Sequence, residues 1–303
     1  RIKWRNRLTP EENFGVIAVE PGESVEEMIL LDGETDDWEQ REAESSQEYP
    51  DFDLSVTHDE ANLYLLARKK GGVWDFSEEE LDVGFGILPG GSRTADQAPG
   101  ATFSEGIQLL LKIKGEEDSQ LFINSGYDYH TWLYAEWLRI LPKDRAEADV
   151  SKGEFLPWRL LLNKALTLPQ SRERVPYEEF DVGVMRPGTT DPEDPEYDSL
   201  ADWFVEGEVL EVRIPWMMLG YTDPSTLQVW DYPYEAGEIR AVESAGVTLY
   251  PLLRSTGDDD PASPESLSYS WEGWEWPTYH ERKKKSYDIM REAFENERLE
   301  PAP

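Results

Sequence analysis

The chain has 303 residues, and its 29 lysines and arginines are outnumbered by 64 aspartates and glutamates, so its formal net charge is −35. Proteins that bind nucleic acid need a basic surface for the phosphates, and the one dense basic run here is Arg282–Lys285. The charge therefore argues against partners that are nucleic acids or anionic membrane surfaces. The longest nearly apolar stretch, Ile107–Leu111, is far shorter than the roughly 20 residues of a spanning helix, so no membrane insertion is expected.

Composition predicts a folded protein with a sizeable core. The chain contains 12 Trp, 14 Tyr and 10 Phe, which is not typical of disordered proteins. It contains no Cys, which excludes disulfides, thiolate metal sites and cysteine nucleophiles. Because the first residue is Arg1 and no leader-like segment follows it, the chain is interpreted as a mature protein or a piece of a longer one.

Apolar residues alternate with polar or small residues along much of the chain, a pattern typical of strands with one buried face. The clearest run is 81–87, where Leu81, Val83, Phe85 and Ile87 alternate with Asp82 and two glycines. Similar runs occupy residues 52–56, 63–67, 107–113, 121–123, 180–184, 210–214, 227–229 and 247–249. The polar stretch 58–62 predicts a hairpin turn between the first two of these runs.

The segments between the runs indicate loops and one helix. Residues 88–101, 185–199 and 255–266 are rich in Gly, Pro and Asp and are predicted to be loops. Residues 132–168 mix helical and strand spacing and stay ambiguous. Near the C-terminus, Thr278 and Glu281 form a capping box, and apolar residues follow at helical spacing. This helix is expected to pack on the sandwich, with a bridge to a neighbouring domain as the alternative.

These elements predict a mainly all-β protein, built as an antiparallel β-sandwich with long loop insertions and a C-terminal helix. A parallel α/β sheet is disfavoured because helical crossovers between the strands are mostly missing. Residues 1–13 are interpreted as a linker or the end of a preceding domain. Residues 14–277 form the predicted sandwich, and 278–303 the helix and tail.

Four short strings occur in an order that resembles a known family. They read LDGETDDW at Leu31–Trp38, VTHDEANLYLLA at Val56–Ala67, ELDVGF at Glu80–Phe85 and EVLEVRIPW at Glu208–Trp216. This order is similar to that of the family 9 carbohydrate-binding modules and the wider DOMON-like β-sandwich superfamily. The resemblance covers about residues 28–90 and 205–235.

The resemblance implies a DOMON-like sandwich in which most of residues 116–199 is an insertion. The combination of the string Tyr197–Trp203, the IPW string and the ending Trp274–Pro277 looks like the C-terminal region of large bacterial extracellular proteins that carry a sugar-active catalytic domain. It therefore implies an extracellular protein, secreted or at the cell surface.

In that family two Trp side chains hold a terminal sugar ring between their faces, which match the C–H faces of a pyranose. By position, Trp74 matches the first Trp, because it lies in a loop just before the strand that begins at Leu81. Candidates for the second are Trp271, Trp274 and Trp276. Packing against the predicted helix is the competing interpretation for Trp274 and Trp276, and burial in the sandwich is expected for Trp38 and Trp216.

The resemblance also implies a structural calcium ion, for which hard oxygen ligands lie close together in the first string. The candidate ligands are Asp32, Glu34, Asp36 and Asp37. Their spacing differs from that of a helix-loop-helix calcium loop, and acidic clusters arise by chance in so acidic a chain. No cofactor other than calcium is expected.

The leading hypothesis is a non-catalytic module that binds a polysaccharide or oligosaccharide and is attached to a catalytic domain in a larger extracellular protein. The chain itself is not expected to be an enzyme. One alternative is a structural or docking sandwich without a ligand. A second is a fragment of a glycoside hydrolase, because 64 carboxylates leave open a pair at catalytic distance.

Overall fold

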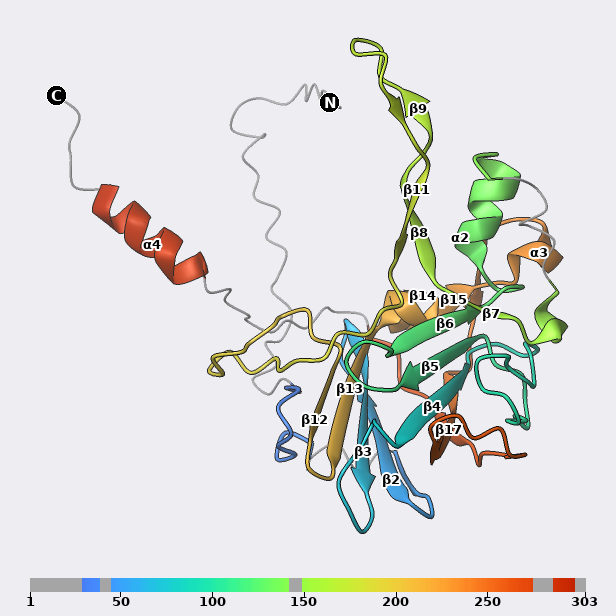
Figure 1. The fold of residues 1–303 in the computed structure, drawn as a ribbon, viewed down its shortest axis with the longest axis vertical. Coiled ribbons are helices and arrows are strands. Elements are labelled where there is room, and N and C mark those ends of the chain that lie inside the picture. The colour runs from blue at the N-terminus through green and yellow to red at the C-terminus, as the bar shows by residue number, and fades with distance from the viewer. Residues whose placement is uncertain (1–28, 39–44, 142–148, 275–285, 298–303) are drawn as a thin grey trace. The chain divides into compact units, whose positions relative to one another are not determined.

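The computed structural model describes residues 29–38, 45–141, 149–274 and 286–297. Within the part from Ile29 to Trp274, two antiparallel sheets of five and six strands pack against each other (Figure 1). The predicted fold class, a mainly all-β sandwich, is confirmed.

The first sheet has the strand order β1-β2-β3-β13-β12. Its strands are β1 (Ser46–Glu48), β2 (Phe52–His58), β3 (Asn62–Lys69), β13 (Val209–Pro215) and β12 (Trp203–Glu206). The predicted hairpin between the first two runs is the β2–β3 pair, in which His58 lies opposite Leu63.

The second sheet has the order β18-β17-β4-β5-β6-β7. Its strands are β18 (Leu267–Tyr269), β17 (Val247–Ser255), β4 (Glu79–Gly86), β5 (Leu109–Ile113), β6 (Gln120–Asn124) and β7 (Phe155–Pro157). β6 and β7 belong to the segment 116–199, so the predicted insertion also supplies two strands of this sheet.

Smaller elements surround the two sheets. A three-stranded sheet consists of β14 (Tyr221–Asp223), β15 (Gln228–Trp230) and β16 (Ala241–Glu243). The short helices are α2 (Tyr129–Trp132), which continues as a π-helical turn over Leu133–Trp137, α3 (Pro233–Ala236), and 3-10 turns at Val150–Lys152, Trp216–Leu219 and Pro224–Thr226.

The main core lies between the two sheets and follows the predicted alternation. Leu81, Val83 and Phe85 of β4 point into it, as do Leu210, Val212 and Ile214 of β13. All six side chains are at most 1% exposed. Successive side chains of a strand point to opposite faces of the sheet, so every second residue of these strands lies in the core.

The outer faces of both sheets are covered as well. Residues 29–38 cover the first sheet, where Ile29 and Trp38 pack on Tyr64 and Leu66. Residues 88–106, most of which are predicted as a loop, cover the second sheet, where Phe103 packs against Leu110 and Tyr250. The buried residues of this second small core are Ala95, Ala98, Ala101, Phe103, Ile107, Leu110, Phe155 and Tyr250. Because strands buried on both faces have little solvent contact, β3 and β5 read as nearly continuous apolar runs.

Ion pairs neutralise the charged side chains on the covered face of the second sheet. Glu80 and Asp82 of β4 are 3% and 1% exposed. The Lys112 Nζ atom lies 2.9 Å from Glu80 Oε1, and Arg254 Nη2 lies 2.7 Å from Asp82 Oδ2. Burial raises the pKa of Asp82 to about 6, although both cations act to lower it. Arg254 Nη1 also donates to the carbonyl oxygens of Pro99 and Asp258, so it ties two loops to the sheet.

Two long β-ribbon segments form an arm that extends away from the sandwich (Figure 1). Its strands are β8 (Arg159–Asn163), β9 (Leu166–Thr167), β10 (Arg174–Val175) and β11 (Glu178–Asp181). β8 pairs with β11, and β9 pairs with β10. The ambiguous segment 132–168 thus contains a helical turn, β7 and the first half of this arm.

A helix is present near the C-terminus, as predicted. It is α4 (Ser286–Glu297), and it contains Tyr287, Met290 and Phe294 of the predicted apolar pattern. The capping box at Thr278 and Glu281 lies outside the described residues, and packing of the helix on the sandwich stays a prediction. Among the residues that the structure describes, none of the helices combines the length and apolar character that crossing a membrane requires.

The covered outer face of the second sheet can be tested with Leu110→Ala. Leu110 is fully buried there, so the substitution should lower the free energy of unfolding by about 3 kcal/mol through lost transfer energy and a cavity. Leu200→Ala is the matched control, because Leu200 is 58% exposed and its loss should change stability by less than about 0.5 kcal/mol. Urea unfolding followed by Trp fluorescence measures both; equal effects would contradict this packing.

Candidate functional site

Trp74, the first predicted sugar-binding residue, is largely buried. It is 8% exposed, and its ring stacks on Phe76 with ring centroids 5.7 Å apart. Its indole nitrogen donates to the Glu208 carbonyl oxygen at 2.9 Å, and Lys69 Nζ lies 5.6 Å from the ring centroid. Protein atoms therefore already cover most of the surface that would stack on a sugar.

Two of the other predicted Trp residues lie together and are half-buried. Trp271 packs on Trp216 with centroids 4.6 Å apart and donates from Nε1 to the Pro224 carbonyl oxygen at 2.8 Å. Trp274 stacks on His58, with centroids 5.8 Å apart and an angle of 25° between the rings. Trp276 lies outside the described residues.

The structure does not bring Trp74 together with Trp271 and Trp274. Trp74 contacts Phe52, the first residue of β2, whereas both other Trp rings contact His58, the last residue of that strand. A seven-residue strand separates these ends by about 20 Å, much more than the thickness of a sugar ring. The clamp expected from the resemblance is therefore not formed by Trp74 with either residue. Trp38 and Trp216 are buried, as predicted.

An aromatic group gathers instead at the end of β2, and we name it the His58 cluster. Its neighbouring ring centroids lie between 4.6 and 5.9 Å apart. The members are His58, Trp216, Tyr221, Tyr269, Trp271 and Trp274. His58 Nδ1 lies 2.6 Å from the Tyr269 hydroxyl, a hydrogen bond that fixes the orientation of both rings.

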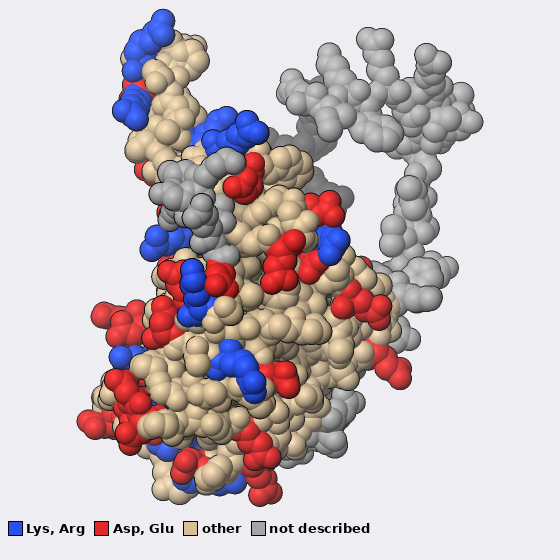
Figure 2. Space-filling model, turned by 90° about the vertical axis from the view of Figure 1, so that its right-hand side faces the viewer, with Lys and Arg blue, Asp and Glu red and all other residues tan. Residues whose placement is uncertain are grey.

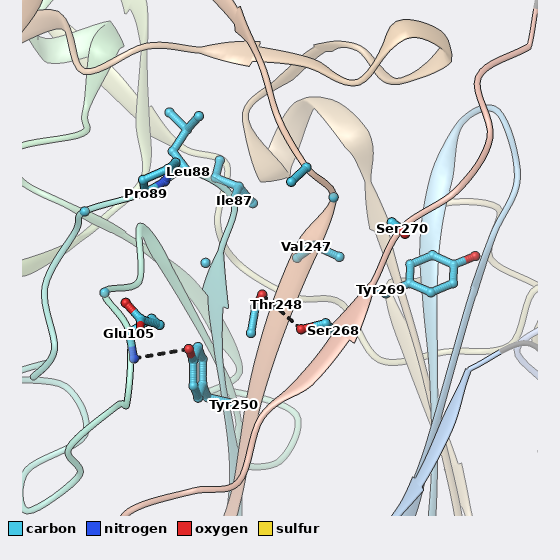
Figure 3. Close-up of a pocket in the computed structure, with 15 residues that line it drawn as sticks. Ile87, Leu88, Pro89, Glu105, Val247, Thr248, Tyr250, Ser268, Tyr269 and Ser270 are labelled. Carbon is cyan, nitrogen blue, oxygen red and sulfur yellow. Dashed lines mark hydrogen bonds between the residues drawn. The ribbon is translucent and has the colours of Figure 1, made fainter.

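A pocket of about 510 Å³ adjoins this cluster (Figure 3). Its lining comes from the end of β4, the turn 87–90, residues 105–106, and the strands β17 and β18. Glu105 and Tyr250 lie at one end, and Tyr269 and Ser270 at the other. Tyr269 belongs to both the pocket lining and the His58 cluster, and its ring lies on the core side of β18. The pocket volume is in the range of small-ligand sites.

Glycines allow the pocket walls to approach closely. A side-chain carbon at Gly106 would lie 2.0 Å from the Gly90 carbonyl oxygen, and one at Gly246 would lie 2.3 Å from the Tyr269 carbonyl oxygen. Gln108, fully buried beneath the turn 87–90, accepts from the Ile87 N–H at 2.8 Å. This wall is therefore fixed by backbone packing and a buried amide.

Hydroxyl groups dominate the polar lining. They belong to Thr248, Tyr250, Ser268 and Ser270. The Tyr269 ring points away from the pocket, and its hydroxyl lies 2.6 Å from His58 Nδ1 (Figure 3). The Tyr250 hydroxyl accepts hydrogen bonds from the Glu105 N–H at 3.2 Å and from Ser104 Oγ at 3.4 Å, which leaves its own proton to donate. Thr248 Oγ1 and Ser268 Oγ lie 3.5 Å apart in the wall (Figure 3).

The pocket lining contains one ionisable carboxylate, Glu105, and neither Lys nor Arg. Glycoside hydrolysis needs two carboxyl groups across the scissile bond, and this lining does not supply the second. Hydroxyls, a carboxylate and nearby aromatic rings are instead the groups that bind polyhydroxylated ligands.

The predicted calcium ligands lie in the segment that covers the first sheet. Asp32 Oδ1 accepts from the Glu34 N–H at 2.9 Å, and Asp37 Oδ2 accepts from the Leu30 N–H at 2.8 Å. Among the described residues, no group of three or more His, Asp or Glu side chains is arranged to hold a metal ion. As placed, Asp32, Glu34, Asp36 and Asp37 do not fit a calcium site, and calcium binding stays a prediction from the resemblance.

The Glu211 side chain holds residues 32–38 on the first sheet through hydrogen bonds. Its carboxylate is fully buried, and it accepts from the N–H groups of Asp32 and Gly33 at 2.9 and 2.8 Å and from the Trp38 indole at 2.9 Å. Burial raises the pKa of Glu211 to about 8, although the three donors act to lower it. The first and last of the four strings thus meet at one buried carboxylate.

The pocket is not predicted by the sequence motifs. One signal was present: in the run 247–249, Val247 and Leu249 face the core, so Thr248 and Tyr250 must face outward. The partners of Tyr250 come from residues 104–105, more than 140 positions away, and no local pattern predicts that contact.

Glu211 makes stability depend on pH in a defined direction. Between the ordinary pKa of 4.5 and the folded value of about 8, the folded protein holds a proton that the unfolded chain has released. Its stabilising contribution is therefore complete below about pH 4.5 and is lost as pH rises through 8. Glu211→Gln, which does not ionise, should lose less stability than the wild type between pH 5 and 8 in urea unfolding. The exposed Glu208→Gln is the control, and parallel curves for all three proteins would contradict the assignment.

Comparison with protein-family models and with curated proteins finds no relative of this chain. The function is therefore argued from the fold and the residues of the site.

Proposed function

We propose that the sandwich is a non-catalytic carbohydrate-binding module that holds a sugar in the pocket beside the His58 cluster. The observation that carries the proposal is the hydroxyl-lined pocket of about 510 Å³, which shares Tyr269 with the cluster that contains two half-buried Trp residues. Sugars combine many hydroxyls with apolar C–H faces, so they match both parts of this surface.

Each part of the site has a distinct role in the proposal. The Tyr250 hydroxyl, held by the Glu105 backbone, donates to a sugar oxygen, and the Glu105 carboxylate accepts from sugar hydroxyls. The half-buried ring of Trp274, which stacks on His58, offers apolar surface in the His58 cluster. No covalent step is assigned to these residues.

The larger setting is also part of the proposal. An extracellular polysaccharide-active protein, with this chain as its accessory module, is the setting that the resemblance implies. A docking role is the second candidate, and exposed apolar side chains on the arm favour it. The two roles do not exclude each other, because the arm and the pocket use different elements.

Isothermal titration with soluble glucans, xylans and mannans tests the proposal, in calcium and then in chelator. We expect a dissociation constant between about 1 μM and 1 mM for at least one sugar. Tyr250→Phe removes one donor and should weaken binding about tenfold, and Trp274→Ala should weaken it at least as much. An effect of the chelator on affinity would support calcium binding.

Trp137→Ala is the matched control, because Trp137 is 70% exposed and lies on the helical turn after α2. Its affinity for the sugar should equal that of the wild type. Thermal unfolding of each variant separates lost binding from lost folding. Absence of heat with every sugar in both buffers, or equal losses in Trp137→Ala and Trp274→Ala, would refute the proposal.

A further inference from the structure

The arm formed by β8–β11 has exposed apolar side chains that the sandwich does not cover. In the β8–β11 pair, Leu160 lies opposite Phe180, and Leu162 lies at a bulge, where the register shifts between Glu178 and Glu179. Phe180 is 54% exposed and Leu162 is 68% exposed. The arm also contacts the helical turn after α2, where the Leu161 N–H donates to the Tyr134 hydroxyl at 3.3 Å.

Exposed apolar residues are concentrated in this region. Between Ile29 and Trp274, the described residues include ten large hydrophobic side chains that are exposed. Seven of them lie on the arm or in the segments at its base: Trp137, Leu138, Leu156, Leu162, Leu168, Phe180 and Val184. Exposed apolar groups scattered singly need no explanation, but such a concentration indicates a contact surface.

The charge of the arm indicates what covers it. Residues 164–175, the tip, contain Lys164, Arg172 and Arg174 against a single acid, Glu173, for a net charge of +2. The net charge of the whole chain is −35. Figure 2 shows Lys and Arg side chains at the end of the arm and Asp and Glu side chains over the sandwich. The tip is therefore complementary to an acidic protein surface, and another copy of this chain presents one.

We propose that the arm is a dimerisation element that binds a second copy of this chain. The exposed side chains of Leu162 and Phe180 pack on the second copy, and the basic tip lies against its acidic sandwich. Because the copies are identical, the second arm makes the same contacts in return, which closes the assembly as a two-fold dimer. A stable dimer of this kind buries about 800 Å² on each copy. The proposal does not depend on sugar binding.

Sedimentation equilibrium tests the proposal on the full chain at protein concentrations from about 1 to 100 μM, because dimer formation follows mass action. The wild type should be dimeric at the upper end of this range. The double variant Leu162→Ser/Phe180→Ser should raise the dimer dissociation constant at least tenfold, as expected for anchor residues. Leu200→Ser/Met217→Ser is the matched control, because these residues are 58% and 77% exposed away from the arm, and it should leave the constant unchanged.

Lys164→Glu/Arg174→Glu tests the charge of the tip separately and should also weaken the dimer. Circular dichroism establishes that each variant is folded. A wild type that stays monomeric at 100 μM would overturn the proposal and assign the arm to a different partner. A dimer that survives the Leu162→Ser/Phe180→Ser change, or that weakens equally in the control, would overturn it as well.

Discussion

The structure depends on the burial of polar and charged side chains under the segments that cover both sheets. A buried charge is costly unless it is paired, and each sheet meets this constraint in a different way. Under residues 29–38, the Glu211 carboxylate accepts from two backbone N–H groups and one indole. Under residues 88–106, Glu80 and Asp82 pair with Lys112 and Arg254. Because these carboxylates have protein partners, irregular segments can pack on the outer faces and exclude the water that would otherwise form hydrogen bonds with them.

The covering segment on the second sheet also creates the candidate site. Residues 88–106 leave part of the outer face of β17 and β18 open, and the pocket lies at this boundary. Its polar groups are outward-facing side chains of these strands, whereas its opposite wall is backbone of the covering segment. The pocket thus exists because the covering segment leaves part of the outer face of the second sheet open. Its shape depends on the wall that Gln108 and the contact between Gly90 and Gly106 hold in place.

Most strands could be predicted because alternation requires only one buried face, and runs such as Leu81–Ile87 and Leu210–Ile214 coincide with β4 and β13. The arm was only partly predicted, since β8 reads Leu-Leu-Leu and has no alternation of polarity. The candidate site depends on distances between residues that are far apart in the sequence, and sequence patterns do not predict such distances. Trp74 and Trp271 are both close to strand ends, but the ends are opposite, and only the assembled sheet distinguishes them.

Arg254 connects parts of the molecule that the chain order separates. Its guanidinium group joins β17 to Asp82 of β4 and to carbonyl oxygens in the two loops that contain Pro99 and Asp258. A lysine would supply the charge but not the planar set of five donors, so it could not reach partners in these several directions from one fixed group. The loop that forms the pocket wall is thereby mechanically linked to the strand that forms its floor. Arg254 is not among the residues that line the pocket, so it acts on the pocket wall only through the loop that it holds.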